Sequence, residues 1–144
     1  VGSNSMQLLG QQYAQFDNYG YDLAMNKPSV KPLEWIASSK KDLLAMLAEV
    51  VDVFGYAMHL AQHGGKHSQS KPLKGFGSAG VLEVVEDDDG NTFRAVYTVK
   101  FSNAVYVLHC FQKKSHKCIE TPKQDMDLIR SRMSLAQQHA EGAK

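Results

Sequence analysis

The sequence has little that would place it in a specialised structural class. It contains two cysteines, too few for a disulfide framework, together with four prolines and one tryptophan in 144 residues. No stretch approaches the roughly 20 apolar residues that a membrane-spanning helix needs, and the first residues do not form a secretory signal. We therefore expect a cytoplasmic protein with no cofactor, no bound metal and no membrane partner.

An excess of charge of one sign is also missing, since the formal net charge is +1. Taken over the whole chain, this value argues against a nucleic-acid-binding protein, which usually has a basic excess. However, residues 1–24 contain two acids and no Lys or Arg, so the remainder carries +3. Two basic segments flank a predicted β region. The four acids of a turn at 86–89 offset their positive charge in the net charge of the chain. The basic residues of these segments are Lys66, Lys71 and Lys74, then Lys113, Lys114, Lys117 and Lys123. Solvated loops would give the same pattern.

The N-terminal segment differs in composition from the rest. Residues 1–5 resemble an expression remnant, and residues 7–24 are polar and aromatic with weak periodicity. From Met25 the composition changes. We expect residues 1–24 to be a tag remnant and an appendage, and residues 25–144 to form a single domain.

The spacing of apolar residues predicts the order of the elements. A short strand is expected at 33–36, followed by a helix from a capping box at 39–42 to a stop at Gly64 and Gly65. Three β runs at 81–85, 93–101 and 104–111 are joined by short turns, and Thr121 and Pro122 begin a last helix. The expected fold class is α+β: a small antiparallel sheet, made of a three-strand meander and the N-terminal strand, with two helices packed against one face.

Three patterns that resemble known motifs lack the context that those motifs need. Residues 75–80 match G-x-G-x-x-G, but a strand follows where a dinucleotide site needs a helix. His59 and His63 have the spacing of a zinc-binding helix, but Leu60 replaces the catalytic Glu, and polar-face histidines explain the pair better. Cys110 and Cys118, with His116, lack a metal-binding spacing, so reduced thiols are expected.

Basic and aromatic residues collect around the β region. Strand alternation places Arg94 with Val96 and Thr98, and it places His109 and Phe111 with Val105 and Val107. If both basic segments fold back over one face, they form a cationic site with an aromatic ring, as single-stranded RNA recognition requires. Scattered solvated lysines, with Phe111 in the core, remain the alternative.

At these residues the chain resembles the phage-derived HigB-like toxins of the RelE/ParE superfamily. The resemblance covers about residues 27–138. It is carried by a Lys-x-Leu loop, an apolar strand with a Glu, a Phe-Arg strand, a Leu-His-x-Phe-x-Lys-Lys-Ser strand end and a Thr-Pro helix start. The matching residues are those of 71–77, 81–84, 93–97, 107–115 and 121–122.

The resemblance implies a toxin of a type II toxin–antitoxin system. Such toxins are ribosome-dependent mRNA endonucleases that inhibit translation, need no metal, and are inhibited by a helix-turn-helix antitoxin. By position, the resemblance implies catalytic roles for Arg94, Lys113, Lys71 and Lys74, and RNA-binding roles for Phe111 and Lys114. For the proton transfers of metal-free RNA cleavage, Lys71 or Lys74, or His109 or His116, are the candidates. His116 and Lys117, which follow the last strand in the second basic segment, are also expected to bind RNA. Val85 departs from the family pattern, since many relatives have Arg there, which leaves room for an attenuated enzyme.

Two other functions fit the same residues. The sheet could hold RNA or a protein partner without catalysis, or the chain could be a gyrase-inhibiting toxin of the ParE branch. Growth arrest with cut mRNA, growth arrest with DNA damage, and the absence of arrest distinguish the three.

Overall fold

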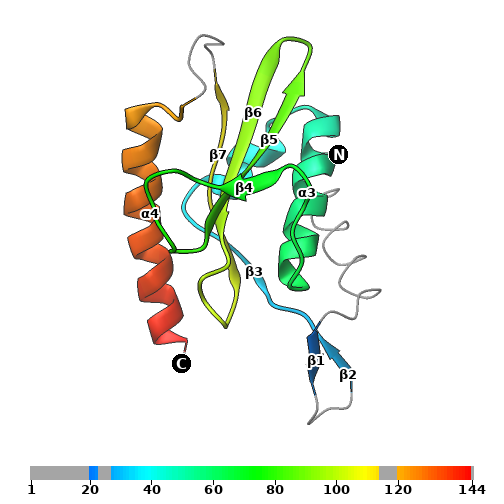
Figure 1. Ribbon diagram of the computed structural model, residues 1–144, viewed down its shortest axis with the longest axis vertical. Helices are drawn as coiled ribbons and strands as arrows, with labels where there is room; N and C mark the ends of the chain where they lie inside the picture. The colour runs from blue at the N-terminus through cyan, green and yellow to red at the C-terminus, as the bar shows by residue number, and fades with distance from the viewer. Residues whose placement is uncertain (1–19, 23–26, 114–119, 144) are drawn as a thin grey trace.

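The computed structural model describes residues 20–22, 27–113 and 120–143, which form an α+β fold with a five-stranded mixed sheet (Figure 1). The expected fold class is confirmed. The strands are β1 (Gly20–Asp22), β2 (Lys27–Ser29), β3 (Leu33–Trp35), β4 (Ser70–Pro72), β5 (Val81–Asp88), β6 (Asn91–Thr98) and β7 (Val105–Lys113). The helices are α2 (Ser39–Leu44), α3 (Ala48–Gln62) and α4 (Lys123–Gly142).

The sheet has the order β3-β7-β6-β5-β4 and is built around the predicted meander of β5, β6 and β7. Asp89 and Gly90 connect β5 to β6, and both have positive φ angles, of 48° and 79°. Two positive φ angles at the centre of a two-residue turn give the twist that antiparallel neighbours need. The acidic turn of the sequence is therefore the tip of a hairpin, with Asp87 and Asp88 inside β5.

The sheet edges differ from the expected antiparallel arrangement. The predicted N-terminal strand is present as β3, but it runs parallel to β7, with Leu33 opposite Val105. At the other edge β4 is an additional three-residue strand, which pairs antiparallel with β5. The separate β1–β2 hairpin pairs Gly20 with Ser29, so its two strands lie on either side of the boundary expected at Met25.

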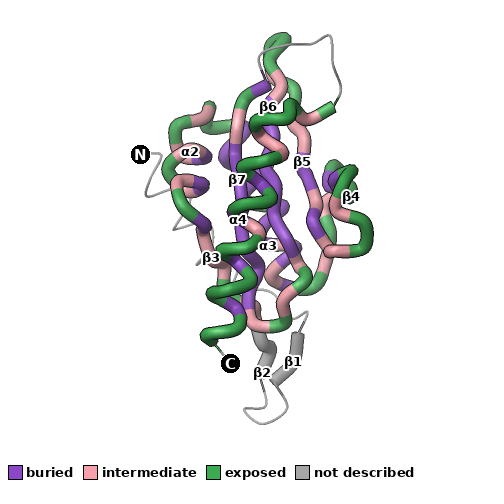
Figure 2. Tube along the Cα trace, turned by 90° about the vertical axis from the view of Figure 1, so that its left-hand side faces the viewer, coloured by how far each residue is buried: buried purple, intermediate pink, exposed green. Residues whose placement is uncertain are grey.

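The helices cover both faces of the sheet, so the expectation of helices on one face is wrong (Figures 1 and 2). On one face α3 packs against Ala95, Tyr97 and Val107, and on the other α4 packs against Val96 and Leu108. Every residue from Val105 to Cys110 is buried. A strand buried on both faces has a continuous apolar run in place of alternation, which is what 104–108 shows.

The first predicted helix is divided in two. Leu47 has an extended backbone (φ −61°, ψ 147°) between α2 and α3, and its side chain is among the exposed apolar ones. The break lets α2 lie against β7, where the Ser39 hydroxyl donates to the Val107 carbonyl at 3.1 Å. The predicted stop is confirmed, because α3 ends at Gln62 and Gly64 takes a φ of +81°.

Neither predicted helix cap forms as expected. Ser38, and not Ser39, precedes α2, and its hydroxyl donates to Asp42 Oδ2 at 2.7 Å. At α4 the capping residue is Pro122, and Thr121 instead accepts a hydrogen bond from Arg94. The apolar stripe of α4 is as predicted, with Ile129 and Ala136 buried.

Candidate functional site

A pocket of about 490 Å³ opens on the α4 side of the sheet, at the start of α4. Its wall comes from β4, from the loop after it, from β5 and β6, and from the approach to α4. The lining residues are Lys71, Pro72, Leu73, Lys74, Gly75, Glu83, Arg94, Glu120, Thr121 and Met126. Three of these side chains are basic and two are acidic, so the pocket combines a cationic excess with two carboxylates.

An ion pair between two neighbouring strands lies in the pocket wall. Arg94 Nη1 is 3.2 Å from Glu83 Oε2, and both side chains are 7% exposed. The same Arg94 nitrogen donates to Thr121 Oγ1 at 3.1 Å, which links the sheet to the approach to α4. A buried pair of this kind is rigid, because neither partner can leave without abandoning the other's charge in a poorly solvated place.

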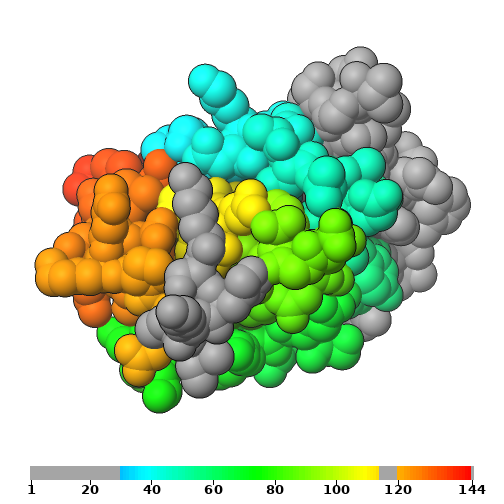
Figure 3. Space-filling view, turned by 90° about the horizontal axis from the view of Figure 1, so that it is seen from above, coloured from blue at the N-terminus to red at the C-terminus, as the bar shows by residue number. Residues whose placement is uncertain are grey.

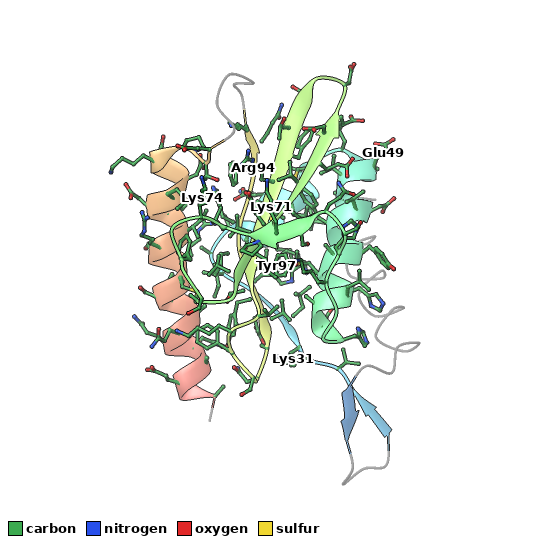
Figure 4. The ribbon with its side chains drawn as sticks, in the orientation of Figure 1. Lys31, Glu49, Lys71, Lys74, Arg94 and Tyr97 are labelled. Carbon is green, nitrogen blue, oxygen red and sulfur yellow. The ribbon has the colours of Figure 1, made fainter. Side chains whose placement is uncertain are left out.

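Lys71 extends the ion pair towards solvent. Its Nζ is 3.7 Å from Glu83 Oε1, and its side chain is 64% exposed. Lys71 is opposite Glu83 in the β4–β5 register, so the short strand folds the first basic segment back over the sheet. Figure 4 shows Lys71 and Lys74 on the same side of the molecule as Arg94. The sequence alone left this fold-back open.

A hydrogen bond on the opposite face fixes the position of β4. The Tyr97 hydroxyl donates to Ser70 Oγ at 2.9 Å, and both residues are buried. Burial raises the pKa of the Tyr97 phenol, with the Ser70 hydrogen bond acting in the opposite direction. Ser70 immediately precedes Lys71, so this contact holds the edge strand that carries the lysine.

A β-bulge in β7 changes which residues share a face. Val96 is opposite His109 but Tyr97 is opposite Val107, which leaves Leu108 as the extra residue. Beyond the bulge, His109 and Phe111 are therefore on the α4 side, whereas Val105 and Val107 remain on the α3 side. The expectation that all four share one face is wrong. The bulge places Phe111 directly opposite Arg94.

His109 is held by α4 through both ring nitrogens. Nε2 is 2.8 Å from Asp125 Oδ1, and Nδ1 is 3.4 Å from Arg132 Nη1. The ring also stacks on Phe111, with centroids 4.6 Å apart and planes inclined by 14°. Burial lowers the pKa of His109, although the hydrogen bond that its ring donates to Asp125 opposes this shift. His109 does not line the pocket, and its ring packs against one face of the Phe111 ring.

We expect His109 to make folding stability depend on pH. Its pKa is lower in the folded protein than its ordinary value of 6.5, so below about pH 6.5 the unfolded chain binds the proton more readily. The contribution of His109 to the free energy of unfolding is therefore fully present above pH 6.5. It is lost as the pH falls from 6.5 through the lower pKa that His109 has in the folded protein. Urea unfolding at pH 7.5 and pH 5 measures the loss. His109→Gln retains a donor for Asp125 and should show a smaller loss than the wild type. Equal losses would contradict this.

The remaining predicted site residues lie further along β7 or outside the described residues. Lys113 is opposite Thr92, is 6% exposed, and does not line the pocket. Phe111 is half-buried and is likewise outside the lining. Lys114, His116 and Lys117 fall in 114–119, which the structure does not describe. Of the predicted site residues that the structure describes, Lys71, Lys74 and Arg94 line the pocket.

The two pocket residues that bind Arg94 were not predicted as site residues. Glu83 appeared in the sequence only as part of an apolar strand, although a carboxylate among Val81, Leu82 and Val84 was a signal of a buried pair. Thr121 was interpreted as a helix cap, and its hydroxyl binds Arg94 instead. Both assignments depend on contacts between residues far apart in the chain.

The other motifs do not form sites in the described part of the chain. There, no three His, Cys, Asp or Glu side chains are grouped as a metal site would require, and no helix is long and apolar enough to cross a membrane. His59 and His63 are buried, at 6% and 2% exposed, so placing them on a polar face is wrong. Cys110 is a buried thiol whose pKa is raised by burial. Residues 75–80 form the predicted loop before β5.

Comparison with known proteins gives one match. A family model described as phage derived protein Gp49-like (DUF891) matches residues 41–134. The match covers about two thirds of the chain and includes every residue that lines the pocket. The comparisons with curated proteins and with solved structures return no match.

Proposed function

The chain belongs to the phage-derived Gp49-like family, a toxin-like family of the RelE/ParE type, and on this premise we propose that it is a HigB-like toxin that cleaves mRNA on the ribosome. Inhibition of translation would follow from the loss of intact message. A co-encoded helix-turn-helix antitoxin would be its inhibitor. The proposal makes the pocket beside α4 the active site.

The observation that carries the proposal is the charge arrangement of the pocket. The Glu83 carboxylate lies 3.2 Å from the Arg94 guanidinium and 3.7 Å from the Lys71 ammonium, and a second lysine, Lys74, lines the same space. RNA cleavage without a metal needs a base, a proton donor and positive charge at the phosphate. The Arg94, Lys71 and Glu83 side chains supply these three functions at one place.

The reaction can be written with these residues. Glu83 accepts the proton of the 2′-hydroxyl, whose oxygen attacks the adjacent phosphorus. The bond from phosphorus to the 5′ oxygen breaks, and Lys71 or Lys74 gives its proton to that oxygen. Arg94 stabilises the charge that develops on the phosphate. The products are a 2′,3′-cyclic phosphate and a 5′-hydroxyl, and no electrons are exchanged.

Other predicted residues have supporting roles in this proposal. Phe111, opposite Arg94 and stacked on His109, would stack on a base, and Lys113 would neutralise a neighbouring phosphate. Lys114, His116 and Lys117 follow Lys113 in the chain and would contact the RNA backbone. His109 would orient Phe111 and would not transfer protons, because both of its nitrogens are engaged.

Induced expression in bacteria tests the proposal. We expect growth arrest together with new mRNA 5′ ends within translated regions, and neither effect when Glu83→Gln replaces the wild type. Arrest with DNA damage and intact mRNA would instead place the chain in the gyrase-inhibiting branch. Expression without arrest would favour a binding module, consistent with Val85 standing where many relatives have Arg.

A further inference from the structure

An aromatic–arginine pair lies beside the pocket and belongs to none of the groups described above. The Arg130 guanidinium carbon is 5.7 Å from the centre of the Phe76 ring. Phe76 is in the loop between β4 and β5, and Arg130 is on α4, two turns after its start. In the space-filling view the start of α4 (orange) and this loop (green) meet at one edge of the molecule (Figure 3).

Gly75 shows that the pair is continuous with the pocket wall. A Cβ at this position would lie 3.1 Å from Met126 Cε and 3.5 Å from Arg130 Nη2. Gly75 and Met126 both line the pocket, so Arg130 borders that wall directly. Gly75 also has a φ of +97°, which disfavours any other residue. The loop backbone therefore lies against α4 and holds Phe76 next to the pocket.

Arg130 is accessible to a ligand. Its side chain is 52% exposed, and its contact with Asp127 Oδ1 is 3.5 Å long. That distance exceeds the 2.7–3.2 Å of ordinary N–H···O hydrogen bonds, and exposed ion pairs are weak. Phe76 is half-buried, packed against the cluster that includes Leu73 and Ile129. The aromatic ring is thus fixed, and the guanidinium is free to accept a second planar partner.

We propose that Phe76 and Arg130 form a subsite for a nucleotide that flanks the cleaved bond in single-stranded RNA. A guanidinium on an aromatic ring presents a flat cationic surface, on which a base stacks and a phosphate is attracted. Lys74, two residues before Phe76 in the chain, lines the pocket together with Arg94. The inference rests on the proposed function, since it extends the RNA beyond the active site.

Binding of uncleavable RNA tests the subsite. The probe is a fluorescent oligonucleotide with 2′-deoxyribose at the scissile position, as a trinucleotide and extended by two nucleotides on the 5′ side or on the 3′ side. We expect one extension to tighten binding to the full-length wild type by about fivefold or more, because stacking of a base on such a platform is worth about that factor or more. In Arg130→Ala and Phe76→Leu the ratio of long to short affinity should fall close to one.

The chain offers a matched control. Lys100 Nζ lies 5.7 Å from the centre of the Phe101 ring, the same separation as in the proposed subsite, but neither residue lines the pocket. Lys100→Ala should keep the wild-type ratio. Asp127→Asn removes a negative charge beside Arg130 and should tighten binding of the extended RNA.

The outcomes separate this inference from the proposed function. If the trinucleotide does not bind the wild type, the RNA site itself is wrong, and the subsite is rejected with it. If the trinucleotide binds through Arg94 but neither extension depends on Arg130 and Phe76, only the subsite is rejected. Equal loss of the ratio in Lys100→Ala would also overturn it, because general charge would then explain the effect.

Discussion

Arg94→Gln is expected to lower the rate of mRNA cleavage by about 10²–10³-fold. Removal of one preorganised donor to a developing oxyanion has an effect of about this size in other enzymes. Arg94 is suited to this role because Glu83 and Thr121 fix its guanidinium at 3.2 and 3.1 Å, so that little reorganisation is needed when the phosphate arrives. Single-turnover cleavage of mRNA on purified ribosomes measures the rate.

Folding must be measured in the same variants. Removing one partner of a buried ion pair costs up to about 3–5 kcal/mol when the other charge stays buried without compensation. After Arg94→Gln, Glu83 keeps only the 3.7 Å contact with the exposed Lys71. Arg94→Gln should therefore also lower the free energy of unfolding, as measured in urea. In the double variant with Glu83→Gln both charges are removed, so we expect most of the stability to return while cleavage does not. Recovery of cleavage with stability would show that Arg94 and Glu83 act only in folding.

Glu83→Gln is expected to lower cleavage by about 10²–10⁴-fold, the usual contribution of a positioned acid or base. Glutamine retains the shape of the side chain and a hydrogen-bond acceptor for Arg94, but it cannot accept the 2′-hydroxyl proton. The variant therefore tests the base more directly than alanine, which would also open a cavity beside Arg94 and Lys71. The same ribosome assay applies.

Glu120→Gln is the matched control, since Glu120 lines the same pocket but is exposed. It removes an equal charge from the site and should change cleavage by less than about tenfold, because a solvent-exposed charge acts through a high dielectric. Equal losses in the two variants would assign the effect to the net charge of the pocket, and the role of Glu83 as a base would then be wrong.

Local patterns predicted most of the fold. Apolar alternation and turn residues located β5, β6 and β7, and helical spacing with Gly64 located the end of α3. The three-residue strand β4 is too short for a periodic signal and contains Pro72. The parallel direction of β3 and the position of α4 on the second face depend on contacts between distant parts of the chain. No window of sequence contains that information.

The site was predicted less completely than the fold. The basic residues Lys71, Lys74 and Arg94 were identified, and they line one pocket because β4 folds the first basic segment back. Strand alternation gave the wrong face for Phe111, because a bulge adds one residue at Leu108 and reverses the period from there on. Glu83 was overlooked as a functional group because the pairing of strands, and not the sequence around it, places it beside Arg94.

The chemistry of the cut ends tests the central claim most directly. Purified protein is added to ribosomes translating a defined mRNA, and the ends of the fragments are identified. Attack by the 2′-hydroxyl predicts a 2′,3′-cyclic phosphate on one fragment and a 5′-hydroxyl on the other, with both products lost in Glu83→Gln and Arg94→Gln. Intact mRNA, or fragments with 5′-phosphate ends that form equally in both variants, would contradict the assignment of this pocket as a ribonuclease site.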